Sequence, residues 1–145
     1  MNVVIVGAGI MGITFATLAK EIAPDLNITI IERLSGPAKS NSSVFNNAGT
    51  GHEANCELNY TPVDEEEIDV ESALHIHSQF NIAKQFWAYL VKKGIIEDAA
   101  SFIHPTKHCT LVHEESIGDL KLRFEEMTRH HFFEGMHYSE DHDEI

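Results

Sequence analysis

The chain has 145 residues, with 10 Lys and Arg against 23 Asp and Glu, so its formal net charge is −13. Hydrophobic residues make up 43 % of the sequence, which is typical of a folded domain and excludes a fully disordered chain. The acidic excess argues against nucleic acid as a direct partner, because a phosphate backbone attracts Lys and Arg.

The first 33 residues are predicted to form a β-α-β unit. The β-branched run at residues 3–6 predicts a strand buried on both faces. A helix is expected from about residue 10 to residue 22, followed by a second strand at residues 28–31. The two strands should be parallel, since a helix connects them.

A glycine motif in this unit predicts a dinucleotide site. Gly7, Gly9 and Gly12 match GxGxxG between the strand and the helix, and Glu32 closes the second strand 20 residues after Gly12. Such glycines allow a tight turn, close approach of a pyrophosphate, and packing of the helix on the strand. Glu32 is expected to accept hydrogen bonds from ribose hydroxyls and to repel the 2′-phosphate of NADP. The spacing leaves NAD and FAD as alternatives.

Residues 34–62 are rich in Ser, Asn, Gly, Thr and Pro, without helix or strand periodicity. A segment of this length is either functional or disordered in a compact domain. Ser42 and Ser43 are candidate donors to a pyrophosphate. His52 is the one histidine of the segment, and a histidine suits removal of an alcohol proton.

The pattern becomes helical again after this segment. Asp64 and Glu67 resemble a capping box and predict a helix that begins there and ends at a Gly94 cap. Residues 110–112 predict a strand, and residues 116–131 predict a last helix.

Three groups of side chains in this part are given structural interpretations. His75 and His77 alternate too closely for one helix face, so both are expected at the surface. The stripe of Phe80, Phe86 and Trp87 is interpreted as a helix core face rather than a quinone site. The His- and acid-rich end of the chain lacks a metal-binding spacing, so no metal is expected.

Several motifs together resemble one enzyme family. They are VGAGIMG at residues 6–12, ERL at 32–34, NNAGTGH at 46–52, CELNYTP at 56–62, and the stretches at 85–91 and 132–141. With these motifs the sequence is similar to the malate:quinone oxidoreductases. These are FAD-dependent enzymes that oxidise malate to oxaloacetate and reduce quinone.

The resemblance implies an α/β fold, a Rossmann-like βαβ fold of the glutathione-reductase type that binds FAD or NAD(P), here incomplete. Residues 1–145 would be the N-terminal part of an FAD-binding domain. Within it, 1–33 would be the dinucleotide-binding unit and 34–62 the flavin-approaching loop. Residues 63–145 would hold helical segments and the start of a substrate-domain insertion.

The resemblance also implies the site residues and the cofactor, FAD. His52 is the candidate catalytic base, with the alternative that it only fixes the loop or binds the cofactor. The cofactor-binding residues would be Gly7, Gly9, Met11, Gly12, Glu32, Arg33, Ser43, Asn46, Asn47, Gly49 and Thr50. Around His108 the match to the family is loose, which leaves a substrate role for that stretch open.

The expected function is FAD-dependent oxidation of (S)-malate with quinone as acceptor, in the tricarboxylic acid cycle. Family members are several times longer, so the isolated chain is expected to be incomplete and inactive. Two alternatives are a non-catalytic dinucleotide-binding module and a truncated, non-functional product.

The expected location follows from cysteine usage and from the resemblance. The two cysteines stand outside any CxxC, which suits a reducing cytoplasm, and no apolar run is long enough to span a bilayer. Family members are typically peripheral on the cytoplasmic face of the inner membrane. Any such contact would depend on sequence not present here.

Overall fold

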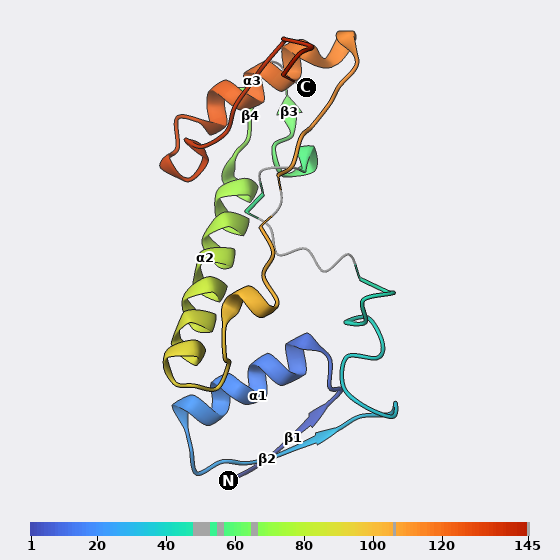
Figure 1. Ribbon diagram of the computed structural model, residues 1–145, viewed down its shortest axis with the longest axis vertical. Coiled ribbons are helices and arrows are strands. Elements are labelled where there is room, and N and C mark those ends of the chain that lie inside the picture. Colours follow the sequence, from blue (N-terminus) through green and yellow to red (C-terminus); the bar gives the residue numbers. More distant parts are fainter. Residues whose placement is uncertain (48–52, 55–56, 65–66, 106, 145) are drawn as a thin grey trace. The chain divides into compact units, whose positions relative to one another are not determined.

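The computed structural model of the chain describes residues 1–47, 53–54, 57–64, 67–105 and 107–144 (Figure 1). The contacts within it divide the chain into two units, Met1–Thr50 and Gly51–Ile145. The first unit contains a small parallel sheet with one helix, and the second contains two helices with a short antiparallel ladder. The expected α/β class is confirmed at this level.

The first unit has the β-α-β order that the sequence predicts. Strand β1 (Asn2–Val6) is followed by helix α1 (Ile10–Ile22) and strand β2 (Asn27–Ile31). The two strands pair in parallel along their whole length. Lys20 near the end of α1 donates hydrogen bonds of 2.7 and 2.8 Å to two carbonyls of the turn that leads into β2. The predicted elements of this unit are therefore confirmed.

Among the described residues, only one face of β1 is covered. Val3 and Ile5 are half-buried, and the Ile5 side chain lies against α1 near Gly12. Val4 and Val6 point to the other face and are 60 % and 84 % exposed. The expectation of a strand buried on both faces is wrong, because the described residues of this unit supply a helix for one face only.

In the second unit a one-turn 3-10 helix at Leu58–Tyr60 precedes a short ladder, which stands where a helix was expected to begin. Val63–Asp64 (β3) and Glu67–Ile68 (β4) pair antiparallel, so Asp64 lies opposite Glu67 and the two form no capping box. Helix α2 begins only at Glu71 and ends at Lys92. The Asp69 carboxylate accepts the N–H of Glu71 at 2.9 Å and so supports the helix start.

The predicted end of α2 is confirmed. Gly94 follows the helix with a φ of +72° and donates its N–H to the carbonyl of Val91 at 2.9 Å. The chain then reverses and runs back beside α2 (Figure 1). On this return Phe102 packs edge-on against Trp87, with ring centroids 5.5 Å apart, and Trp87 packs against Phe80 at 6.0 Å. These contacts support the structural interpretation of the aromatic stripe.

The last helix is shorter than predicted, and the expected strand before it is absent from the described residues. Residues 110–112 are irregular and Leu111 is 68 % exposed, because no described strand lies beside them to pair with. Helix α3 spans Ile117–Met127, with one-turn 3-10 helices at Glu114–Ser116 and His131–Phe133. Beyond it, the Thr128 hydroxyl donates to the carbonyl of Phe124 at 2.7 Å.

The core of the second unit joins α2 to the end of the chain. Ala54, Ala73, Met127 and Phe133 are each at most 4 % exposed and form one cluster. His77, one turn after Ala73, is 5 % exposed, so its expected surface position is wrong. His75 is exposed, as expected, and its ring bonds Gln79 at 2.8 Å. His77 is buried and His75 is exposed because the Ala73 face of α2, which carries His77, packs on the aromatic residues that follow α3.

Candidate functional site: a glycine turn with an acidic partner

The turn between β1 and α1 depends on two glycines. Gly7 has a φ of +100°, which L side chains rarely adopt, and it donates its N–H to the carbonyl of Ile31 at 2.8 Å. At Gly12 an added Cβ would lie 2.3 Å from the carbonyl oxygen of Gly7. No larger residue fits there unless the backbone shifts. Gly9 is the N-cap of α1, so the turn leads directly into the N-terminus of the helix.

Glu32 closes this turn from the end of β2. One oxygen of its carboxylate accepts the N–H of Ala8 at 2.8 Å, and the other accepts the N–H of Leu34 at 2.8 Å. These hydrogen bonds, first that from Leu34 and then that from Ala8, lower the pKa of Glu32 below its ordinary value of 4.5. Each carboxylate oxygen has capacity for a further donor, such as a ribose hydroxyl.

The lowered pKa of Glu32 predicts an acid-sensitive turn. A carboxyl whose pKa is lower in the folded state adds stability above pH 4.5, and this stability is lost as the pH falls through the lowered value. We expect the protection of the β1 and β2 amides, measured relative to their intrinsic exchange rates at each pH, to fall below pH 4.5 more in the native chain than in a Glu32→Gln variant. An equal loss of protection in both chains between pH 5 and pH 2.5 would contradict this prediction.

The segment after β2 folds onto the glycine turn. Ala38 donates its N–H to the carbonyl of Ala8 at 3.0 Å. The Ser42 hydroxyl oxygen accepts the N–H of Ile10, the first residue of α1, at 2.9 Å. Ser43 is turned to its own loop, where its hydroxyl oxygen accepts the N–H of Phe45 at 3.4 Å. Of the two adjacent serines, Ser42 is therefore the one that reaches the helix N-terminus.

These elements enclose a pocket of about 500 Å³, a size within the range of small-molecule sites. Gly7, Gly9, Glu32 and Arg33 of the expected site residues line it. Lys39, which the sequence reasoning missed, also lines it and donates from Nζ to the Ser35 hydroxyl at 2.9 Å. Its charged lining residues are two cations and one carboxylate, so the pocket is locally positive within an acidic chain. This balance suits a phosphate-bearing ligand.

The other expected site residues lie elsewhere or outside the description. Met11 is 81 % exposed on α1 and does not line the pocket. Asn46 donates from its side-chain amide to the carbonyl of Ser40 at 3.1 Å, and Asn47 is exposed. Three expected residues fall outside the described residues: Gly49, Thr50 and His52.

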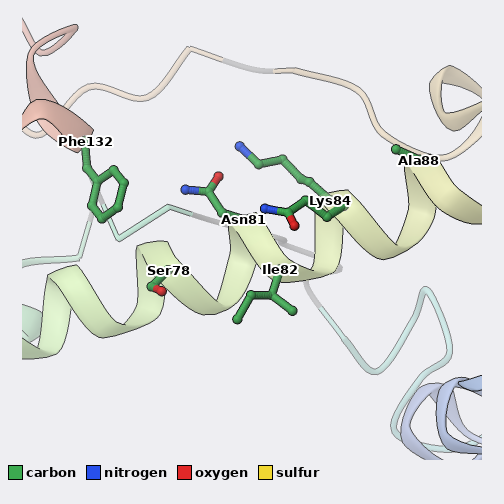
Figure 2. Close-up of a pocket in the computed structure, with 7 residues that line it drawn as sticks. Ser78, Asn81, Ile82, Lys84, Ala88 and Phe132 are labelled. Carbon is green, nitrogen blue, oxygen red and sulfur yellow. The ribbon is translucent and has the colours of Figure 1, made fainter.

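A second hollow, of about 520 Å³, lies along α2 in the other unit, and none of the expected site residues line it. It is bordered by polar side chains of α2 together with the ring of Phe132 (Figure 2). Within the described residues, no group of three or more His, Cys, Asp or Glu side chains is placed to hold a metal ion. The glycine turn is therefore the better candidate for a cofactor site.

Comparison with known proteins assigns the family. The family model described as malate:quinone oxidoreductase matches residues 1–145. A "Probable malate:quinone oxidoreductase" of Granulibacter bethesdensis is 47 % identical over 142 residues, which cover 97 % of this chain and 28 % of the relative. Relatives with the same name from Bradyrhizobium diazoefficiens and a Geobacillus species are each 46 % identical over the same shares. The chain thus spans about 28 % of the length of these relatives, and it belongs to the malate:quinone oxidoreductase family.

Proposed function

We propose that the chain forms the part of an FAD site that holds the ADP portion of the cofactor, within a Rossmann-like fold. One observation carries this proposal: the glycine turn brings the N-terminus of α1 and the carboxylate of Glu32 to a single pocket. In dinucleotide sites these two features hold the pyrophosphate and the adenosine ribose. The glycine turn would suit either FAD or NAD, and we choose FAD because of the family to which the chain belongs.

The residues of the pocket fit such a ligand. The N-terminal N–H groups of α1 and its positive dipole end favour a pyrophosphate, and Arg33 and Lys39 add positive charge beside it. Glu32 accepts ribose hydroxyls with the lone pairs that Ala8 and Leu34 leave free. Its negative charge disfavours a 2′-phosphate. The Ser42 hydroxyl, which already bonds the first N–H of α1, is placed to donate its proton to a phosphate oxygen.

For the protein of full family length we propose oxidation of (S)-malate to oxaloacetate with quinone as the electron acceptor. When bound, FAD supplies the acceptor for the hydride that leaves the alcohol carbon. In this chain, residues 1–33 bind and orient the cofactor, and residues 34–62 lead from the pyrophosphate toward the flavin. Residues 63–145 begin the substrate domain. We propose His52 as the base that takes the hydroxyl proton of malate.

The proposed partners are malate and quinone. Because quinone lies in the membrane, the protein would have to act at the membrane surface. Within the described part of the chain, no helix combines the length and apolar character needed to cross a bilayer. We propose that the protein acts on the cytoplasmic face of the inner membrane as a peripheral protein. The contact with the membrane would be made by other parts of the full-length protein.

Ligand titration of the chain tests the proposal. ADP and FAD should bind at the same site and compete with each other, while FMN, which lacks the adenosine, should not compete. Adenosine 2′,5′-bisphosphate should bind at least about tenfold more weakly than ADP, because it lacks the pyrophosphate and its 2′-phosphate meets the charge of Glu32. Competition of FMN with ADP, or equal affinity for the two adenosine phosphates, would contradict the proposed site.

A further inference from the structure

We propose that His77 and Lys84 of α2 are positioning residues for the segment that approaches the flavin, because they hold Glu53 and Ala54 in place. This inference rests on the proposed function, which assigns residues 34–62 to that approach. All four residues that carry it are described and belong to the second unit. We refer to the contacts of His77 and Lys84 with Glu53 as the α2 clamp.

The α2 clamp contacts Glu53 at both its backbone and its side chain. The Nδ1 atom of His77 lies 3.2 Å from the carbonyl oxygen of Glu53. Because a carbonyl only accepts, this bond requires the hydrogen of the ring on Nδ1. Lys84 pairs with the Glu53 carboxylate through its Nζ. His77 and Lys84 are seven residues apart, two turns of the helix, so both act from one side of α2.

The His77 ring is itself held in place. It stacks on Phe132 with the ring centroids 4.3 Å apart and the planes 13° apart, and it meets the edge of Phe133 at 5.4 Å. The ring is 5 % exposed, so its rotation would displace both aromatic neighbours. The hydrogen bond to Glu53 is therefore set by the packing of the core and not by a mobile surface side chain.

Ala54 fixes the same point from the core. It is 1 % exposed within the cluster that contains Ala73, Met127 and Phe133. Its φ of +65° is left-handed, a conformation that a residue with a Cβ keeps only when its surroundings determine it. Two consecutive residues, Glu53 and Ala54, are thus tied to α2 within the segment proposed to approach the flavin.

The two contacts of the clamp differ in their exposure. Figure 2 shows Asn81 and Lys84 projecting from one side of α2 and Ile82 from the other, and Lys84 borders the open hollow of about 520 Å³. The side chains of Lys84 and Glu53 are 42 % and 33 % exposed, whereas His77 is buried. Salt should therefore weaken the ion pair and leave the His77 contact unchanged.

A charge exchange tests the ion pair in the 145-residue chain. Lys84→Glu should make amides of a peptide containing Glu53 and Ala54 exchange about two- to fivefold faster, and the double variant Glu53→Lys with Lys84→Glu should restore slow exchange. Lys92→Glu, with the same change of charge on the same helix, should leave this peptide unaffected. His77→Phe keeps the stacking but loses the hydrogen bond, and it should also speed exchange. His75→Phe is its exposed control.

The positioning role needs a measurement that reports on the flavin itself, because faster exchange at Glu53 and Ala54 shows only that these residues are held less tightly. With FAD bound, Lys84→Glu and His77→Phe should change the visible circular dichroism of the flavin, with less than about a threefold change in affinity for ADP. The charge-exchanged double variant should return the native spectrum. Unchanged exchange in both single variants would overturn the clamp, and faster exchange with an unchanged flavin spectrum would overturn its positioning role. If the native chain binds neither ADP nor FAD, the proposed function fails instead, while the exchange data still decide whether the clamp exists.

Discussion

Replacement of Gly12 by alanine is expected to abolish ADP binding and to destabilise the first unit by about 1–3 kcal/mol, the usual cost of overpacking. The added Cβ would stand 2.3 Å from the carbonyl oxygen of Gly7, and this neighbour is backbone that cannot rotate away. Relief requires α1 to move off β1, which would displace the helix N-terminus from the pocket. Urea unfolding followed on amide signals of β1 and β2, with ADP titration of the same samples, measures both effects.

Gly118 in α3 provides the matched control for this substitution. An added Cβ there meets no described atom within 4 Å. Gly118→Ala should therefore leave ADP binding unchanged and stabilise its helix by about 0.5–1 kcal/mol, the cost of a helical glycine relative to alanine. Unaltered ADP affinity in Gly12→Ala would show that the turn does not set the nucleotide site.

Glu32→Gln is expected to weaken ADP binding at least about tenfold, because hydrogen bonds to a charged acceptor are stronger than those to a neutral amide. The amide nitrogen of glutamine would also face the N–H of Ala8 or that of Leu34, where two donors cannot bond. Loss of the negative charge should narrow the preference for ADP over adenosine 2′,5′-bisphosphate. Calorimetric titration with both ligands measures the two effects together.

Asp25→Asn is the control for Glu32→Gln. Asp25 is an exposed acid of the same unit, in the turn before β2, and it does not line the pocket. The same loss of one negative charge at Asp25 should change neither the affinity for ADP nor the preference between the two adenosine phosphates. If the two variants behave alike, the effect comes from net charge, and the ribose contact of Glu32 is excluded.

The first unit could be predicted from sequence because each of its features depends on local spacing. A β-branched run, a glycine turn and a helical repeat each have a characteristic pattern, and parallel pairing follows from the helix between the strands. The position of Glu32 beside the turn followed from its place at the end of the second strand. The exposure of Val4 and Val6 did not follow, because burial depends on what else covers the sheet.

The second unit was predicted less well because its structure depends on contacts between residues that are far apart in the sequence. Asp64 and Glu67 have the spacing of a capping box, yet they face each other across a ladder. His77 is polar and follows His75 at a spacing that one helix face does not accommodate, but Phe132 and Phe133 bury its ring. These aromatic residues lie more than 50 residues further along the chain, so no local pattern indicates the contact.

Among the residues that line the candidate pocket, the sequence indicated Gly7, Gly9, Glu32 and Arg33, but it did not indicate the contacts of the loop. Ser42 and Ser43 are adjacent and chemically identical, so only the path of the loop shows which hydroxyl reaches α1. Lys39 belongs to no recognised motif. It lines the pocket because the hydrogen bond from Ala38 to Ala8 brings this part of the loop to the glycine turn. Such choices depend on backbone geometry that composition and spacing do not encode.

The most direct test of the central claim is a nitrogen-15 NMR titration of the chain with ADP. We expect the largest shifts on the backbone amides of Ala8, Ile10 and Leu34, which already donate to Glu32 and Ser42 around the pocket. Amides of α2 and α3 should remain unchanged at saturating ADP. Absence of any shift, or shifts centred on the hollow along α2, would contradict the assignment of the nucleotide site to the glycine turn.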